Sequence, residues 1–202
     1  MVAVATGQHG VVATGQLERF GLASGTITLY ARAGRLHRIH NGVYALTPPQ
    51  LLKPNARRMA AVLAAGPGAA LSHATASAHL GLIPSNERTT HVTVPSRGGR
   101  SRAGITIHRS STLRPTDITD VNGIRTTTAH RTLLDLAEHL SQQRLARAID
   151  RAITLNHFDL HALLEQIEHN HARVRGARNL KRALAPINPP PPPTGTSSRS
   201  AS

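Results

Sequence analysis

The sequence predicts an α+β fold in two unequal parts. In residues 9–46, short helical patterns are followed by a β-ribbon pattern, and Glu18 is the only acidic residue before residue 87. Farther along, apolar and polar residues alternate between residues 90 and 109, and a helical period returns from residue 128. We therefore expect a small N-terminal module followed by a mostly helical domain with a small β-sheet.

Short helices are expected at the start of the chain. Residues 1–9 can form the first helix. Thr14 stands where a second helix needs an N-cap, and Gly21 ends that helix. Ser24 can cap a third helix, and Gly34 supplies the exit residue that needs a positive φ.

A β-ribbon is expected after these helices. Residues 36–40 form a short strand, Asn41–Gly42 is a strong two-residue hairpin signal, and residues 43–46 form the return strand. Strict alternation would place residues 36, 38 and 40 on one face, although neither face is purely apolar. Helices followed by such a hairpin indicate a winged helix-turn-helix, with the third helix as recognition helix and the hairpin as wing.

The charges of this segment indicate double-stranded DNA as its partner. Arg32, Arg35, Arg38 and Lys53 are basic, whereas Glu18 stands alone as an acid, so a phosphate backbone is the natural partner. The alternative is that these residues form an ordinary solvated surface. The predicted DNA contacts come from the recognition helix and the wing, and they are Ser24, Thr26, Thr28, Leu29, Tyr30, Arg32, Arg35, His37, Arg38, His40 and Asn41.

The second part is expected to begin near residue 50. Asn55 can cap a helix that runs through Ala65, and Ser72 can cap another that ends before Gly81. Residues 91–94 and 105–108 form either a hairpin or two neighbouring strands. Their connection, residues 96–104, carries arginines among glycines, and it is either a second phosphate-contacting loop or a flexible, soluble turn.

Helices dominate from residue 128 onwards. The expected core consists of apolar residues at helical spacing, namely Leu133, Leu134, Ala137, Leu140, Leu145, Ala148, Ile149, Ala152, Ile153, Leu160, Leu163, Leu164 and Ile167. A proline run follows a last basic helix, and a segment of that composition cannot bury a core. The expected domains are therefore 1–50, 51–185 and a disordered tail, 186–202.

Composition excludes several classes of protein. Lys and Arg number 24 against 10 Asp and Glu, which gives a net charge of +14 and favours an anionic partner. No cysteine is present, so a disulfide framework and a thiolate metal site are excluded. No segment approaches the roughly 18 apolar residues of a membrane helix. We expect a cytoplasmic protein that makes no membrane contact.

The sequence shows no catalytic constellation. Asp135 and Glu138 are spaced i, i+3 and can be explained as the solvated side of an amphipathic helix, while Asp117 lies in a stretch that suits turns and caps. His157 and His161 are spaced i, i+4, but neither an HExxH motif nor a cysteine completes a zinc set. We expect neither an enzyme, nor a cofactor, nor a metal.

The order of several phrases resembles a known family. They are GVVATGQL, FGL, AGRLHRIHNGVYAL, GPGAALSHATASAHLGL, HVTVPSRGGR, ITIHRS and TTTAHRTLLDLAEHL, and they cover roughly residues 7–184. This order looks like that of AbiEi-type antitoxins from bacterial toxin-antitoxin systems. Many relatives carry several arginines in the middle of the recognition helix, where this chain has Thr28, Leu29 and Tyr30.

The resemblance implies a repressor that binds inverted repeats in its own promoter, beside a gene for a nucleotidyltransferase-type toxin. Some longer relatives append a nuclease-like domain, whereas this chain continues into prolines, so we expect no nuclease activity. Two alternatives stay open. One is an antitoxin that acts by direct contact with its toxin, and the other is a remnant of a nuclease-bearing relative.

Overall fold

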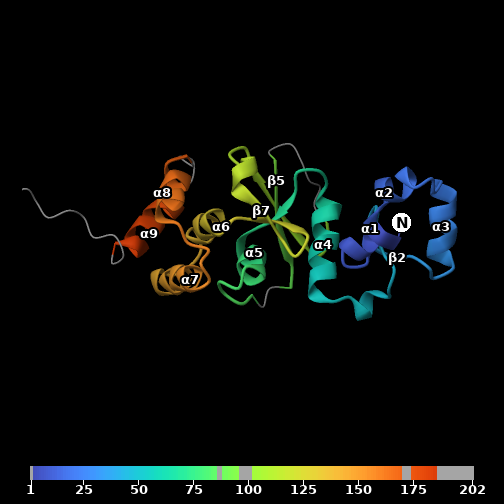
Figure 1. Ribbon diagram of the computed structural model, residues 1–202, viewed down its shortest axis with the longest axis horizontal. Coiled ribbons are helices and arrows are strands. Elements are labelled where there is room, and N and C mark those ends of the chain that lie inside the picture. The colour runs from blue at the N-terminus through green and yellow to red at the C-terminus, as the bar shows by residue number, and fades with distance from the viewer. Residues whose placement is uncertain (1, 86–87, 96–101, 170–173, 186–202) are drawn as a thin grey trace, which may run out of the picture.

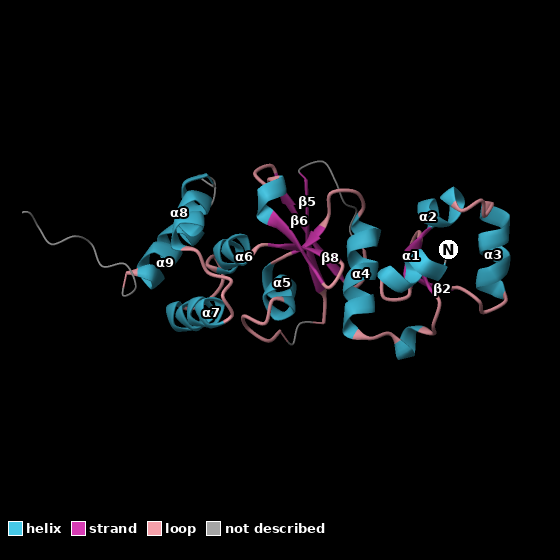
Figure 2. Cartoon of the chain, viewed as in Figure 1, coloured by secondary structure: helices cyan, strands magenta, loops and turns pink. Residues whose placement is uncertain are grey.

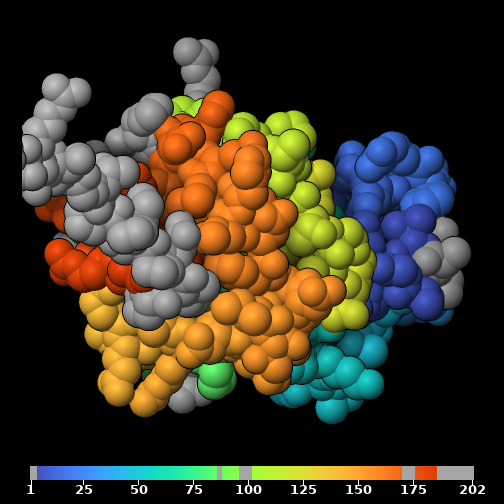
Figure 3. All heavy atoms as spheres, turned by 60° about the vertical axis from the view of Figure 1, so that its left-hand side comes forward, coloured from blue at the N-terminus to red at the C-terminus, as the bar shows by residue number. Residues whose placement is uncertain are grey.

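The protein is a stack of layers in the computed structural model, which describes residues 2–85, 88–95, 102–169 and 174–185. Figure 1 shows the layers in order: an N-terminal module, helix α4 (Pro54–Ala65), a five-stranded sheet, helices α5 (His73–His79) and α6 (Ala129–Leu136), and helices α7 (Gln142–Thr154), α8 (Leu160–His169) and α9 (Val174–Leu184). In the space-filling view, the N-terminal module lies on the far side of the sheet from α7 and α8 (Figure 3). The predicted α+β fold is confirmed.

The N-terminal module has the winged helix-turn-helix topology that the sequence predicts. Its elements are α1 (Val2–Gly7), β1 (Val11–Ala13), α2 (Thr14–Arg19), α3 (Ser24–Arg32), β2 (His37–His40) and β3 (Val43–Ala45). The three strands pair antiparallel in the order β1-β3-β2. Val12, Leu17, Ile27 and Leu36 are buried together beneath the helices and form the small core of the module.

The starts of α2 and α3 differ from the predicted caps by one residue. Both helices begin at the predicted caps themselves, Thr14 and Ser24, so the N-cap positions fall on alanines. At α2 the Gln16 side chain accepts a hydrogen bond from the N–H of the N-cap residue Ala13 (2.9 Å). α4 begins at Pro54 with Lys53 as N-cap, two residues before the predicted cap, because the fixed φ of proline suits the first helical position. The predicted cap of α5, Ser72, is confirmed.

The wing departs from strict alternation. The pairing of β2 with β3 shifts register between Arg38 and His40, which is the signature of a β-bulge. The expected shared face of residues 36, 38 and 40 is wrong. Leu36 lies just before β2 and is buried, Arg38 is exposed, and the bulge separates Arg38 from His40. The predicted turn is present, and Gly42 adopts a φ of +75°.

Helix α4 lies between the two sheets and is buried on nearly all sides (Figure 2). Its side chains form one continuous core with Val11, Val43 and Ala45 of the module and with Val92 and Ile124 of the larger sheet. Alanine dominates the helix because a sandwiched helix needs small side chains for both sheets to approach closely. The winged module therefore buries its sheet against the rest of the chain.

The larger sheet has the strand order β6-β5-β4-β8-β7. Its strands are β4 (Ala70–Leu71), β5 (Thr90–Pro95), β6 (Ile105–Ser110), β7 (Ile118–Val121) and β8 (Ile124–Thr127), with short 3₁₀ turns at Pro49–Leu51 and Pro115–Asp117. β5 and β6 pair in parallel, so they are neighbouring strands and not the hairpin that was the other possibility. Residues 96–101 of their connection lie outside the described part of the chain.

Helices α7, α8 and α9 pack on α6 and complete a second core around Leu133, Leu145, Leu163 and Leu180. Of the expected core residues, Ile153 is wrong, because 45% of its surface is exposed near the end of α7. No helix within the described residues is both long enough and apolar enough to cross a membrane. The predicted disordered tail, 186–202, lies outside the described residues.

A buried ionic network links α6 to the sheet. Asp135 belongs to it, although the sequence predicts a solvated side for this residue, whereas Asp117 caps the turn Pro115–Asp117 as the sequence predicts. Arg131 and Asp135 are fully buried one helical turn apart, with Arg131 Nε 2.9 Å from Asp135 Oδ1. Arg131 also reaches Asp117 Oδ2 at 3.5 Å, and Asp117 accepts a hydrogen bond from the Arg114 backbone N–H. Asp135 is thus not on a solvated helix side, because a buried arginine one turn earlier satisfies it.

Candidate nucleic-acid interface

Helix α3 presents an exposed face with the chemistry of a recognition helix. Ile27 points into the core and is 2% exposed, which turns the opposite side of the helix to solvent. That side carries Ser24, Thr28, Leu29 and Arg32, and Leu29 is 62% exposed although it is a large apolar residue. A hydroxyl, an apolar side chain and a guanidinium therefore lie on one exposed face of the helix. Groups of these kinds can form hydrogen bonds and apolar contacts with the edges of DNA bases.

The flank of α3 is fixed by contacts inside the module. Thr26 and Tyr30 are half-buried, and Tyr30 packs against the core that contains Ile27. The Tyr30 carbonyl accepts the backbone N–H groups of Arg35 and Leu36, while the Arg35 guanidinium lies 5.6 Å from the Tyr30 ring centre. These contacts fix the exit from the helix into the wing and hold Arg35 at the exposed corner between them.

The wing carries a positioned arginine. Arg38 is exposed, and its Nη2 donates to Asn41 Oδ1 at 2.8 Å, so the tip of the hairpin orients the guanidinium. His37 and His40 are half-buried beside it. Burial, and to a lesser extent the nearby charge of Arg102, lower the pKa of His40, so this imidazole is neutral at physiological pH.

Arg102 is the residue that sequence reasoning did not place. Its Nη1 donates to the Asn41 carbonyl at 3.4 Å, although 61 positions separate the two residues in the chain. The sequence offered only a loop of residues 96–104 with two possible roles, and nothing in that stretch signals which surface it approaches. The structure brings a fourth guanidinium, with Arg32, Arg35 and Arg38, to the side of the module that carries the wing.

The one carboxylate of the module lies at the start of α3. Glu18 belongs to α2, and its Oε1 accepts a weak hydrogen bond from Ser24 Oγ at the start of α3 (3.4 Å). The positive end of the α3 dipole stabilises the carboxylate at this position. A phosphate group would be repelled there, so the part of this surface that suits an anion runs from the middle of α3 towards the wing. All eleven predicted contact residues lie on α3, the following turn or the wing.

The residues once considered for a metal site do not converge. His161 Nδ1 lies 3.6 Å from Glu165 on an exposed helix face, and His157 is exposed in the preceding turn. Within the described ranges, no group of three or more histidine or acidic residues is arranged to hold a metal ion.

Comparison with known proteins identifies the remainder of the chain. Residues 68–185, more than half of the sequence, match the family model of the AbiEi antitoxin C-terminal domain. The protein belongs to the AbiEi antitoxin family. The resemblance read from the sequence is thereby confirmed, and membership supports an antitoxin role in a toxin-antitoxin system. The match begins after α4, so the winged module of this AbiEi antitoxin precedes the matched residues.

Other comparisons are more distant. No curated protein matches this AbiEi antitoxin. Among solved structures, the crystal structure of the RV2827C protein from Mycobacterium tuberculosis is similar with a TM-score of 0.44 and 18% identity, covering 90% of this chain and 79% of that chain.

Proposed function

We propose that this AbiEi antitoxin is a DNA-binding repressor that autoregulates the operon of a type IV (AbiE-like) toxin-antitoxin system. It binds double-stranded DNA at inverted repeats in its own promoter, and the operon encodes a nucleotidyltransferase-type toxin. The supporting observation is the exposed face of α3 beside a wing whose arginine is oriented by Asn41, in a segment with a single acid. The protein acts by binding and not by catalysis.

Two kinds of contact are proposed, one for reading bases and one for position. Thr28, Leu29 and Arg32 enter the major groove, where an arginine can donate two hydrogen bonds to guanine and an apolar side chain can contact the thymine methyl. Arg38 on the wing, and Arg35 at the corner, contact phosphates. The remaining predicted residues line the edges of this surface, namely Ser24, Thr26, Tyr30, His37, His40 and Asn41.

The test compares three substitutions by fluorescence anisotropy on the promoter duplex and on single-base variants of it. Arg32→Ala should weaken binding and relax the preference at one base pair, at a cost of about 1–3 kcal/mol. Arg38→Ala should weaken binding to all duplexes about equally, because phosphate contacts carry no direct sequence information. Arg147→Ala is the matched control, since Arg147 is exposed on α7 at the other end of the molecule (Figure 1).

The result that would overturn the assignment is specific. If Arg38→Ala changed base preference while Arg32→Ala did not, α3 would not be the recognition helix. If Arg147→Ala weakened binding as much as Arg32→Ala, the affinity would come from general charge and not from the winged module.

One observation favours a second candidate function. The residues that define family membership, 68–185, exclude the winged module, so the antitoxin effect can reside in direct contact with a toxin. Co-expression with the product of the adjacent gene separates the two candidates. A complex that co-purifies at high salt, where DNA contacts are weak, supports direct contact, and its absence supports repression alone.

A further inference from the structure

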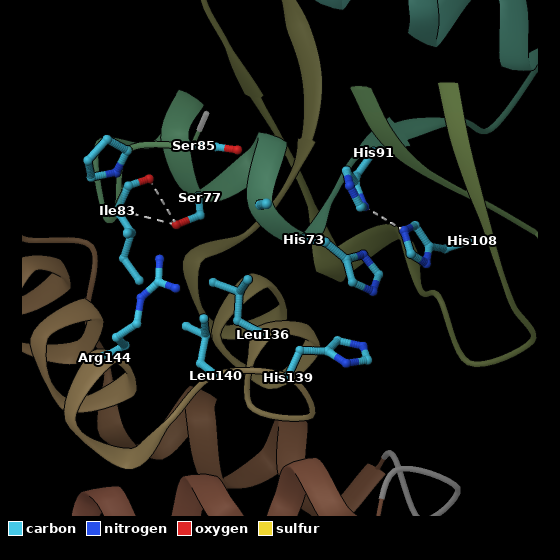
Figure 4. A pocket seen from close by; sticks show the side chains of 12 residues that line it. His73, Ser77, Ile83, Ser85, His91, His108, Leu136, His139, Leu140 and Arg144 are labelled. Atoms are coloured by element: carbon cyan, nitrogen blue, oxygen red, sulfur yellow. Dashed lines mark hydrogen bonds between the residues drawn. The ribbon is translucent and has the colours of Figure 1, made fainter. Parts of the chain in front are cut away.

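A cavity of about 650 Å³ lies on the opposite side of the larger sheet from the winged module. Its upper wall comes from α5, β5 and β6, and its lower wall comes from the end of α6 and the start of α7 (Figure 4). This volume falls in the range of pockets that hold small organic ligands, roughly 300–1,000 Å³. Neither the winged module nor the family match assigns a role to it.

Among the described residues, all ionisable side chains that line the cavity are basic. They are His73, His91, His108, His139 and Arg144, and no carboxylate of the described ranges joins them in the lining. They come from five places in the fold: α5, β5, β6, the turn after α6, and α7. Such a convergence from distant parts of the chain favours an anionic ligand, because imidazole and guanidinium N–H groups donate to phosphate oxygens.

The three histidines of the upper wall form a stacked cluster. The rings of His73 and His108 are stacked with their centres 3.6 Å apart, and His91 Nδ1 lies 2.8 Å from His108 Nε2 in a hydrogen bond (Figure 4). Stacked rings place their nitrogens in successive layers and not around one point. This arrangement suits a row of hydrogen-bond donors rather than a metal ion, and the cluster is not among groups able to hold a metal in the described residues.

The innermost histidine is held by buried polar groups. His73 is 5% exposed and adopts a φ of +50°, an unusual backbone conformation for a residue with a side chain. Its Nδ1 lies 3.0 Å from Ser72 Oγ and 3.8 Å from Asp135 Oδ2, and Asp135 belongs to the buried ionic network. A carboxylate behind an imidazole orients the ring.

Most of the remaining lining is apolar, apart from Ser77 and Ser85. Leu136 and Leu140 lie between the histidine cluster and Arg144, and Ile83 lies above Arg144 (Figure 4). Pro84 also lines the cavity. Ser77 Oγ accepts the Ile83 N–H at 3.2 Å, which fixes this segment against α5. The cavity thus offers donors to an anionic group and an apolar shelf to a planar or apolar body.

We propose that this cavity binds a small phosphorylated ligand of the size of a mononucleotide. Imidazole N–H groups and the Arg144 guanidinium hold the phosphate, and the base or another flat body lies on the apolar shelf. The proposal does not rest on the repressor function, because the cavity lies apart from the winged module.

Isothermal titration of the full chain with AMP, inorganic phosphate and adenosine tests the proposal. AMP should bind at least about tenfold more tightly than adenosine, because hydrogen bonds from imidazole and guanidinium groups to a phosphate are charge-assisted and adenosine lacks the phosphate. Arg144→Ala should weaken AMP binding about tenfold or more. Arg144 is exposed, so this variant should keep its fold, which a thermal melt checks. His108→Gln is the second variant, and Arg147→Ala, one turn along α7, is the control.

Each outcome of these titrations either supports or overturns the proposed mononucleotide site. AMP binding that depends on Arg144 and His108 but not on Arg147 supports a mononucleotide site. Equal affinity for AMP and adenosine, or an equal loss with Arg147→Ala, overturns it. If AMP fails to bind and Arg144→Ala instead weakens promoter DNA binding, the cavity serves a DNA phosphate and the proposal is wrong. If Arg144→Ala leaves promoter binding intact while AMP binding is lost, the site is distinct from the winged module.

Discussion

Replacing buried Arg131 with methionine should destabilise the protein more than a change at any exposed arginine. The Arg131 side chain is fully buried, and its Nε donates to Asp135 at 2.9 Å, its Nη1 to Asp117 at 3.5 Å and its Nη2 to Ser110 at 3.2 Å. Methionine fills a similar volume but removes the positive charge. Asp117 and Asp135, both 0% exposed, would remain in the core without this guanidinium.

The expected loss is about 3–5 kcal/mol, the usual cost of breaking a buried ion pair by removing one partner. Since 1 kcal/mol shifts the melting temperature of a chain of this size by about 2–4 °C, the melting temperature should fall by roughly 6–20 °C. Urea unfolding and thermal melts followed by circular dichroism measure both quantities. Arg147→Met, at an exposed position on α7, should change stability by less than about 0.5 kcal/mol.

A double substitution separates the ion pair from packing. If the charge pair carries the stability, Asp135→Asn should cost clearly less in the Arg131→Met background than in the wild-type protein. A loss below about 1 kcal/mol for Arg131→Met alone, or equal costs of Asp135→Asn in both backgrounds, would refute the reasoning.

Three further predictions concern backbone fit, pH and the division of the chain. Gly176→Ala should destabilise the protein by about 1–3 kcal/mol in urea unfolding, because the new Cβ would lie 3.0 Å from the Leu134 carbonyl oxygen. Gly25→Ala should stabilise the protein by about 0.5–1 kcal/mol, because no atom lies near the new Cβ and alanine suits a helix better than glycine. The opposite order would contradict the packing of α9 on α6. Burial lowers the pKa of three histidines in the folded protein, namely His40, His79 and His130. At pH values below about 6.5 the unfolded chain therefore binds more protons than the folded protein, and the melting temperature should fall as the pH is lowered. Above that pH this contribution to stability should be fully present. Substituting glutamine for His79 should flatten this decline, and an unchanged decline would exclude His79 as a source. A fragment of residues 1–50 should unfold without a cooperative transition, since the module packs its sheet on α4 and its His9 donates to Asn122 O at 2.7 Å; a sharp melt would show an independent domain.

Local chemistry explains what could be read from the sequence. Gly34 marks the exit of α3, and Gly42 lies in the hairpin turn of the wing. Both adopt positive φ, because the conformation that each turn requires is a property of a few adjacent residues. Leu145 and Ile149, spaced one helical turn apart in α7, are both buried as predicted. These signals need no knowledge of the remaining chain.

The features that could not be predicted from the sequence depend on contacts between distant parts of the chain. Strands β5 and β6 show the same period in a hairpin or in a parallel pair, and only their pairing in the sheet, where β6 lies at the edge beside β5, shows that they are parallel. The spacing of Asp135 along its helix is typical of a solvated side. Its burial depends on the ionic network, in which Arg131 also contacts Asp117 of another element. The contact of Arg102 with the wing and the stacked histidines are of the same kind, since neither has a local pattern.

The candidate DNA surface could be predicted from the sequence only in part. The sequence placed the helix and the wing correctly, because Gly34 and Gly42 mark their ends, and Ile27 is the one residue of α3 that is fully buried. It could not separate the exposed Thr28 and Arg32 from the half-buried Tyr30, since that depends on the packing of the module core. The bulge in the wing also decided which of its side chains are free.

The salt dependence of binding to the promoter tests the central proposal most directly. A winged module that contacts roughly four to six phosphates gives a log–log slope of affinity against salt near −4 to −5. Titrating the full chain onto promoter DNA between about 50 and 200 mM salt should give that slope, and Arg38→Ala should reduce its magnitude by about one. A slope near zero, or a slope that Arg38→Ala leaves unchanged, would contradict DNA binding through the wing.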